Sequence, residues 1–297
     1  MGARAAARVV SAALLALAVS AHAEPAAGEV RALAETVAVA PGQTLLDLAR
    51  AHDLGYVELV AANPRVDPWL PAPGATILLP TTHLPPDAPH RGLVVNLADM
   101  RLYAWVDGVP ASMPVGIGRD GFELSPASTR VTGKRVHPSW VPPPSVRAER
   151  PDLARVVPPG PDNPLGDYAL DLGLPMVRIH GTNKPDGVGR RVSHGCLRLY
   201  PEDIARLFSK VAPGTPVAIV DQPAKLGRFG GELFLEVHPS PAQADQLAET
   251  HRLSPEPLPG IEDRVAATAA GDVNRVDWSV VAWVVETRMG VPVQVTR

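Results

Sequence analysis

Residues 178–198 read RIHGTNKPDGVGRRVSHGCLR and contain the only cysteine of the 297-residue chain, preceded by two histidines. A lone thiol has no partner for an intrachain disulfide, and in an oxidising compartment it is a liability unless it is buried or used. A free thiol is mostly protonated at neutral pH, so a nucleophilic Cys196 needs an imidazole to accept its proton. His180 and His194 both fit that role, and the residues alone do not choose between them. The stretch therefore predicts a cysteine nucleophile with a histidine base.

Three other interpretations of this stretch compete with the nucleophile. A zinc site would use His180, His194 and Cys196, but the His-x-Cys spacing crowds two ligands and no fourth lies nearby. A packed, inert cysteine leaves the clustering unexplained, whereas Gly195 beside the thiol keeps backbone N–H groups approachable, as an oxyanion site requires. The glycines lack the G-x-x-x-x-G-K-[ST] pattern of a phosphate loop. We therefore expect no metal and no cofactor.

The segments around this stretch predict a mainly β domain with few helices. Alternating apolar residues between turn signals predict strands, beginning with an antiparallel meander. These strands fall within 92–118, 130–136, 167–173, 177–180, 215–220 and 231–239. Residues 137–146, HPSWVPPPSV, are expected to be extended, with prolines that exclude a central strand. Pro201, followed by Ile204, Leu207 and Phe208 at helical spacing, predicts one amphipathic helix on the sheet.

Residues 37–80 indicate a small separate unit of βααβ order. A short strand leads through Pro41-Gly42 into a helix containing Leu45 and Leu48. A second helix ends at Asn63, because the residue before a proline avoids the α region. The segment ATILLP at 75–80 closes the unit as a strand. A proline-rich linker follows at 84–92, and residues 276–296 near the C-terminus predict a buried helix and a final strand.

The first 23 residues have the features of a cleavable export signal. Arg4 and Arg8 precede a short apolar run that ends in Ala21-His22-Ala23, the small-residue pattern that signal peptidase needs. No later stretch approaches the roughly 20 apolar residues of a membrane span. A formal net charge of −3 argues against non-specific nucleic-acid binding, which needs a basic surface. We expect a protein exported to the periplasm.

The segment IHGTNKPDGVGRRVSHGCLRLYPEDI resembles the signature of the L,D-transpeptidase family, whose catalytic domain is YkuD-like. The resemblance implies a β-sandwich catalytic domain at 92–221, preceded by a LysM-like, peptidoglycan-binding domain at 36–81 and followed by an extension of unknown role at 222–297. It also implies the roles of the site residues. These are Cys196 as nucleophile, His180 as proton donor and acceptor, His194 as support, Gly195 as a backbone oxyanion donor, and Ser193, Arg198, Gly181 and Thr182 as substrate-binding residues.

The resemblance further implies the reaction. The thiolate attacks a tetrapeptide stem of peptidoglycan, D-alanine leaves, and the resulting thioester is transferred to an amine. That amine belongs to another stem or to the lysine of an outer-membrane lipoprotein, and carbapenems typically react with the same thiol. A hydrolase on the same scaffold and a non-catalytic peptidoglycan-binding module are the alternatives. Two departures from the family pattern are Thr129-Arg130-Val131-Thr132-Gly133, where T-P-T-G is common, and Arg178, where an aromatic residue is common.

Overall fold

One long strand, β7 (Ala127–Val136), joins the two halves of the largest sheet in the computed structural model, which describes residues 32–106 and 108–297. Its first residues pair with β12 (Pro216–Val220), and its last residues pair with β8 (Tyr168–Leu172). The register shifts between Val131 and Gly133, where the strand passes from one half to the other. Residues 129–133, where the family pattern often has T-P-T-G, therefore lie within this strand, at the point where its pairing changes.

The eight strands of this sheet run in the order β11-β9-β8-β7-β12-β3-β4-β5. The predicted meander is confirmed, because β3, β4 and β5 pair in antiparallel fashion. A separate two-stranded ladder joins β6 and β10. The remaining strands of this lobe are β3 (Gly92–Asn96), β4 (Arg101–Val106), β5 (Val109–Pro114), β6 (Ile117–Gly118), β9 (Arg178–His180), β10 (Arg191–Ser193) and β11 (Leu197–Arg198).

Helix α4 (Pro201–Lys210) packs on this sheet, as its apolar spacing predicts. It begins at Pro201, whose missing N–H costs nothing in the first turn, and it buries Ile204 and Leu207. Both halves of the sheet and α4 contribute to one hydrophobic cluster. The mainly β class is therefore confirmed, and the sandwich takes the form of a single curled sheet.

The expectation that residues 137–146 are extended throughout is wrong at its end. A short helix, α3 (Pro144–Glu149), begins at the third of three consecutive prolines. Pro143 keeps an extended conformation as the N-cap, and Pro144 occupies the first helical position, where its fixed φ is already suitable. The prolines therefore start a helix here as well as excluding a strand.

The N-terminal unit has the predicted βααβ order, with β1 (Glu35–Ala38), α1 (Leu45–Ala51), α2 (Tyr56–Ala62) and β2 (Thr76–Leu79). The two strands pair in antiparallel fashion. Thr44 and Asp47 form a capping box that starts α1. Helix α2 ends at Asn63, whose buried side-chain amide bonds to the backbone of Leu59 and Leu78. The expected helix end before Pro64 is confirmed.

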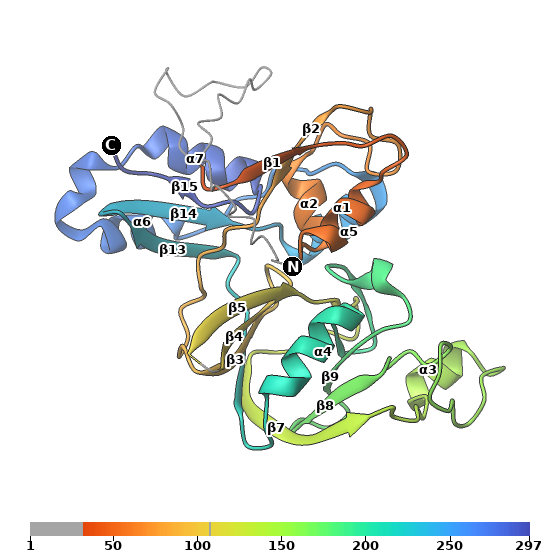
Figure 1. The fold of residues 1–297 in the computed structure, drawn as a ribbon. Coiled ribbons are helices and arrows are strands. Elements are labelled where there is room, and N and C mark those ends of the chain that lie inside the picture. Colours follow the sequence, from red (N-terminus) through yellow and green to blue (C-terminus); the bar gives the residue numbers. More distant parts are fainter. Residues whose placement is uncertain (1–31, 107) are drawn as a thin grey trace, which may run out of the picture.

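The C-terminal segment forms its own three-stranded sheet in the order β13-β14-β15. Its elements are β13 (Ala224–Phe229), β14 (Glu232–Val237), α5 (Pro241–Thr250), α6 (Ile261–Ala269), α7 (Trp278–Thr287) and β15 (Val293–Gln294), which confirms the predicted final helix and strand. Figure 1 shows this sheet in the upper lobe together with the N-terminal unit, above the lobe of the large sheet. Ala62 and Leu78 of the N-terminal unit belong to the hydrophobic cluster of this segment.

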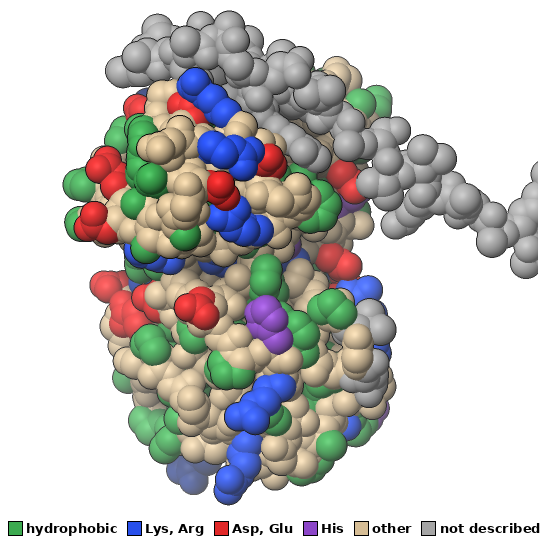
Figure 2. Space-filling model, turned by 90° about the vertical axis from the view of Figure 1, so that its left-hand side faces the viewer, with side chains coloured by type: hydrophobic (Ala, Val, Ile, Leu, Met, Phe, Trp, Pro, Cys, Tyr) green, Lys and Arg blue, Asp and Glu red, His purple; other side chains and the backbone are tan. Residues whose placement is uncertain are grey.

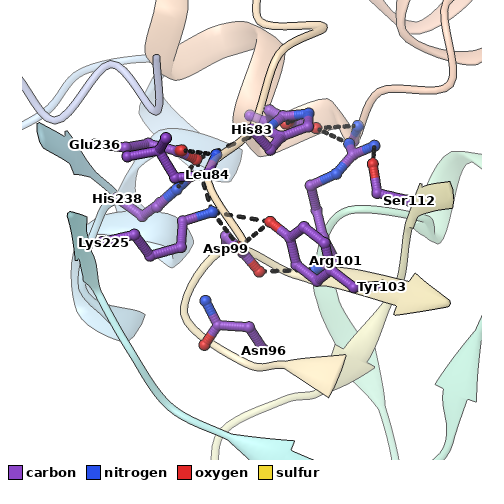
Figure 3. Close-up of polar contacts among 12 residues, drawn as sticks. His83, Leu84, Asn96, Asp99, Arg101, Tyr103, Ser112, Lys225, Glu236 and His238 are labelled. Atoms are coloured by element: carbon purple, nitrogen blue, oxygen red, sulfur yellow. Dashed lines mark hydrogen bonds and ion pairs between the residues drawn. The ribbon is translucent and has the colours of Figure 1, made fainter. Parts of the chain in front are cut away.

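A network of buried charged groups ties these parts together (Figure 3). Lys225 of β13 places its Nζ 2.7 Å from both Asp99 and Glu236. His238 contacts Glu236 at 2.7 Å, and the Tyr103 hydroxyl donates to Asp99. The network spans β4, β13 and β14, so the C-terminal sheet is fixed to the large sheet by ion pairs that water does not screen.

The face shown in Figure 2 carries acidic and basic side chains interspersed, with no extended area of a single sign. Among the described residues, no helix is long and apolar enough to cross a membrane. The predicted export signal at 1–23 lies outside the described residues.

Candidate active site

The pairing of β11 with β9 brings the segment of Cys196 beside the strand of His180. The two strands are parallel, with Leu197 opposite Ile179 and Arg198 opposite His180. Leu197 and Ile179 are fully buried, and Arg198 and His180 share the opposite face. Cys196 directly precedes β11, and the charges of Arg178 and Arg198 act on both its thiol and the imidazole, so the two groups lie in the same neighbourhood.

His180 is held as a neutral imidazole with a defined proton position. Its side chain lies at the end of β9 and is 3% exposed. Nδ1 lies 2.6 Å from the carbonyl oxygen of Gly181, which can only accept a hydrogen bond, so Nδ1 carries the proton. Burial, and then the charge of Arg198, lower the pKa of His180 to about 3. Nε2 is therefore an unprotonated nitrogen at neutral pH.

Cys196 is half-buried, and its thiol is protonated in the resting geometry. Burial raises the thiol pKa, while a backbone hydrogen bond from Arg178 and the charges of Arg178 and Arg198 oppose that rise. The S–H donates to the carbonyl of Met176 at 3.5 Å. Met176 has a left-handed φ of 63° and an exposed side chain, and nothing in the sequence indicated its contact with the thiol. Reaction thus starts from a neutral thiol and a neutral imidazole.

Ser193, which the sequence predicts as a substrate-binding residue, braces the turn that carries the nucleophile in this structure. It is 0% exposed, and its hydroxyl donates to the carbonyl of Cys196 at 2.6 Å. The same Oγ accepts the N–H of Gly195 at 3.1 Å. The Gly195 N–H, expected as an oxyanion donor, is therefore already bonded in this structure. Gly195 has φ 93°, a left-handed conformation that glycine adopts without strain.

Gly181 and Thr182, also expected to bind substrate, lie buried behind the base. Gly181 contributes the carbonyl that orients His180, and its own N–H donates to the Tyr168 carbonyl. Thr182 is 5% exposed, and its Oγ1 accepts the N–H of Lys184. In this structure both residues therefore position His180 and the turn that follows it.

His194 points to a different set of partners from His180. Its Nε2 lies 3.2 Å from a carboxylate oxygen of Glu149 and 3.2 Å from Nη2 of Arg119. Its ring meets the edge of Phe122. Arg119 also pairs with Glu149, so helix α3 closes over this side of the site through one carboxylate. Sequence analysis missed Glu149 and Arg119 because they are distant in the chain and carry no motif.

The two arginines beside the thiol differ in their pairing. Arg178, where the family pattern often has an aromatic residue, pairs with Asp171 at 2.6 Å. Arg198 is half-buried, and its Nε has no hydrogen-bond partner among the described residues. Burial lowers the pKa of Arg198, while the Cys196 thiolate would raise it. The charge of Arg178 is thus balanced by Asp171, whereas Arg198 pairs with no carboxylate among the described residues.

One group of side chains has the composition of a metal site, although it lies outside this face. Asp99, Glu236 and His238 place their donor atoms within 4.8 Å of one another. The ammonium group of Lys225 already lies between the two carboxylates, at 2.7 Å from each. These residues therefore do not fit a resident metal ion, because its position is occupied by a cation of the chain.

A thiol just before β11 and a neutral imidazole at the end of β9 are the two kinds of group that acyl transfer by a cysteine requires. The family model described as the L,D-transpeptidase catalytic domain, YkuD, matches residues 90–219. The probable L,D-transpeptidase YcfS of Escherichia coli K12 is 38% identical over 86% of this chain and 81% of its own length. The probable L,D-transpeptidase ErfK/SrfK of Salmonella typhimurium is 38% identical over 88% of this chain and 86% of its own length. This chain belongs to the L,D-transpeptidase family and is an L,D-transpeptidase.

A third relative, the probable L,D-transpeptidase YbiS of Escherichia coli K12, is 37% identical over 85% of this chain and 83% of its own length. Among solved structures, the avibactam carbamoyl enzyme of Ldtfm is 20% identical, with a TM-score of 0.37 over 46% of this chain and 50% of that one.

Proposed function

We propose that this enzyme acts on peptidoglycan in the periplasm, with Cys196 as nucleophile and His180 as its proton acceptor and donor. The observation that supports the assignment is the β9–β11 register, which brings the segment of Cys196 beside the strand that ends in the neutral imidazole of His180. His194 is the weaker candidate for the base, because its Nε2 contacts Glu149 and Arg119. Arg198, a cation without a carboxylate partner among the described residues, is the group that meets a substrate carboxylate.

The proposed reaction has two steps. The Cys196 sulfur attacks the carbonyl of the third residue of a tetrapeptide stem as its proton passes to Nε2 of His180. The C–N bond to D-alanine breaks, the leaving amine takes that proton, and a thioester remains on Cys196. An amine then attacks the thioester, gives its proton to His180, and takes the peptide as the thiol is restored. The acceptor is the side-chain amine of another stem or a lipoprotein lysine.

A neutral resting pair is compatible with this chemistry. The thiol pKa is raised and the pKa of His180 is about 3, so a stable thiolate–imidazolium pair does not form before substrate binds. Proton transfer therefore accompanies attack on the carbonyl. Substrate that excludes water and brings the carbonyl to the sulfur supplies the driving force for this transfer.

The N-terminal unit supports a second part of the proposal, that residues 36–81 bind the glycan. Trp69 and Leu70, in the loop between α2 and β2, are 47% and 82% exposed. An exposed indole provides the flat apolar surface on which sugar rings stack. Trp69→Ala should reduce sedimentation of the protein with purified peptidoglycan, whereas Trp278→Ala, which removes an exposed tryptophan of the C-terminal segment, should not.

The catalytic proposal is tested by incubating residues 24–297 with tetrapeptide muropeptides, with and without a lysine-ended peptide, and identifying products by mass spectrometry. Release of D-alanine with a covalent Cys196 adduct supports it. Cross-linked or peptide-bearing products indicate transfer, and simple tripeptides indicate the hydrolase. Cys196→Ala should abolish both adduct and products. Retention of activity by that variant, or loss in His194→Gln with full activity in His180→Gln, would overturn the assignment.

A further inference from the structure

The N-terminal unit contacts the connection that leads to the nucleophile. The first turn of α2 donates two hydrogen bonds to it, from Val57 N–H to the carbonyl of Gly189 at 3.2 Å and from Tyr56 N–H to that of Val188 at 3.5 Å. The first N–H groups of a helix have no partner within the helix. Here the connection before β10 supplies the missing acceptors, so the N-terminus of α2 rests directly on it.

The two backbones approach so closely that only glycine fits on either side. A methyl group at Gly55 would lie 2.8 Å from Cα of Gly189, closer than real side chains come. Gly55 itself has φ −84°, which any residue can adopt, so the restriction at Gly55 is contact alone. Gly189 has φ 69°, and a methyl group there would overlap the backbone of Gly55. Any larger residue at Gly55 must push the connection away.

The contact continues along the chain to the nucleophile turn. The guanidinium carbon of Arg190 lies 3.6 Å from the centre of the Tyr56 ring, a cation–π stack. The carbonyl of Arg190 accepts a hydrogen bond from Ile117 of β6, and that of Ser193 accepts one from Arg119. Residues 189–193 are therefore held between α2 on one side and β6 on the other, and the turn braced by Ser193 follows at once.

Helix α2 is itself fixed to the large sheet. The carboxylate of Glu58 accepts the N–H of Gly55 at 2.9 Å and Nη1 of Arg101, on β4, at 2.8 Å. Both side chains are buried, and Arg101 also donates to the carbonyl of Asp53. Figure 3 shows Arg101 beside His83, which lies just before the linker, and Ser112 of β5. The N-terminus of α2 is therefore a fixed support for residues 188–190.

We propose that the N-terminal unit is a positioning element for catalysis, in which Gly55, Tyr56 and Glu58 hold residues 188–190 so that Cys196 stays opposite β9. The proposal rests on the proposed role of Cys196 as nucleophile, and it gives the N-terminal unit a task separate from glycan binding. It assigns to Gly55, more than a hundred residues before the nucleophile, an effect on the thiol that it never touches.

Gly55→Ala is the direct test, with Gly271→Ala as the matched control. Neither glycine has a left-handed φ, and a methyl group at Gly271 meets nothing within 4 Å. Gly189→Ala is paired with Gly74→Ala, which has a similar φ of 81° and open space. Each variant is assayed for kcat and KM of D-alanine release, for thermal unfolding, and for the pH dependence of Cys196 alkylation by iodoacetamide. Cys196 is the only reactive thiol, so alkylation reports on it alone.

We expect Gly55→Ala and Gly189→Ala to lower kcat by about tenfold or more, with KM within about twofold, because a displaced nucleophile loses rate more than affinity. Their alkylation should shift to higher pH, since the displaced sulfur loses the hydrogen bond from the Arg178 backbone. Gly271→Ala and Gly74→Ala should keep the wild-type kcat and the wild-type pH dependence of alkylation. This should hold even if their melting temperatures fall as much as those of Gly55→Ala and Gly189→Ala. Wild-type kcat and alkylation in the clash variants, or equal losses in the controls, would overturn the proposal.

A second pair of variants covers the case in which the alanine variants do not fold. Tyr56→Phe keeps the ring over Arg190 and should keep wild-type kcat, whereas Tyr56→Leu removes the stack and should lower it. Equal kcat in the two contradicts the proposal. If wild-type protein releases no D-alanine, the proposed function fails, but the alkylation profiles of the same variants still decide whether the N-terminal unit positions the thiol.

Discussion

Arg198 lies directly opposite His180 in the parallel pairing of β11 with β9, so a guanidinium and the candidate base share one face of the sheet beside the segment of Cys196. The charge of Arg198 adds to burial in lowering the pKa of His180, and it favours the thiolate of Cys196. The imidazole is therefore kept unprotonated, and its Nδ1 bonds to the backbone carbonyl of Gly181 in place of a carboxylate. Its consequences can be measured in stability, thiol reactivity and turnover.

The neutrality of His180 should make the folded protein sensitive to acid. Its pKa is about 3 when folded, against an ordinary value of 6.5, so below pH 6.5 the unfolded chain binds a proton that the folded chain does not. Stability from this group is therefore present above pH 6.5 and lost as pH falls toward 3. Between pH 6.5 and 4.5 the loss should be about 2–3 kcal/mol.

Urea unfolding at pH 6.5 and 4.5 of wild type and His180→Gln measures this loss. The variant has no group titrating at this position, so its stability should fall less over the same interval. Parallel changes in the two proteins would show that His180 does not account for the acid sensitivity.

Replacing Arg198 should change the ionisation of the thiol through charge. Arg198→Gln removes a cation that favours the thiolate, so the pKa of Cys196 should rise further and alkylation should require higher pH. Arg198→Lys keeps the charge without the planar guanidinium and should stay close to wild type. Alkylation rates across pH 6–10 test this, and equal shifts in the two variants would indicate that Arg198 acts by bracing the loop instead.

The carboxylate of Glu149 should affect substrate access more than chemistry. It pairs with Arg119 and with His194, and it is the contact by which α3 reaches the nucleophile turn. Ion pairs at such exposed positions are weak, so Glu149→Gln should raise KM by up to about fivefold and leave kcat nearly unchanged. Asp152→Asn is the control, because that carboxylate pairs with Arg150 in the same segment. A drop in kcat with constant KM in Glu149→Gln would place Glu149 in the chemical step.

Replacing Lys225 should lower the free energy of unfolding more than replacing an exposed lysine. Its ammonium lies 2.7 Å from both Asp99 and Glu236 in a buried site, so Lys225→Met leaves two buried carboxylates without their cation. We expect a loss of about 3–5 kcal/mol in the free energy of unfolding. Lys184→Met, at an exposed position, should change it by less than about 0.5 kcal/mol. Urea unfolding of the two variants compares them, and similar stabilities would contradict a structural role for the network.

Local signals in the sequence predicted most elements of the fold. The alternation in β3 and β4 and the spacing of Ile204 and Leu207 after Pro201 each reflect a periodicity that one segment carries by itself. The helix after Pro143 was missed because three consecutive prolines are compatible with both an extended chain and a helix start. Membership of the L,D-transpeptidase family followed from the motif around Cys196 and was confirmed.

Other features depended on contacts between distant segments. Ser193, Gly181 and Thr182 were expected at the substrate, and the structure adds that all three are buried and bonded within the chain, which a motif cannot reveal. Glu149 and Met176 reach the site from separate loops whose paths depend on the whole sheet. The close approach of Gly55 to Gly189 likewise joins parts of the chain that no local pattern connects.

By itself, the sequence determined that there is one thiol, that two histidines precede it, and that both stand in a glycine-rich stretch, because these are properties of the residues present. The tertiary structure decided that the strand of His180 pairs with the strand after the thiol, that His194 contacts Glu149 and Arg119, and which unit supports the turn. The reason is that strand register and interdomain contact are set by the packing of the whole chain. The strand of His180 lies beside the segment of Cys196 because β11 pairs with β9 in one particular register.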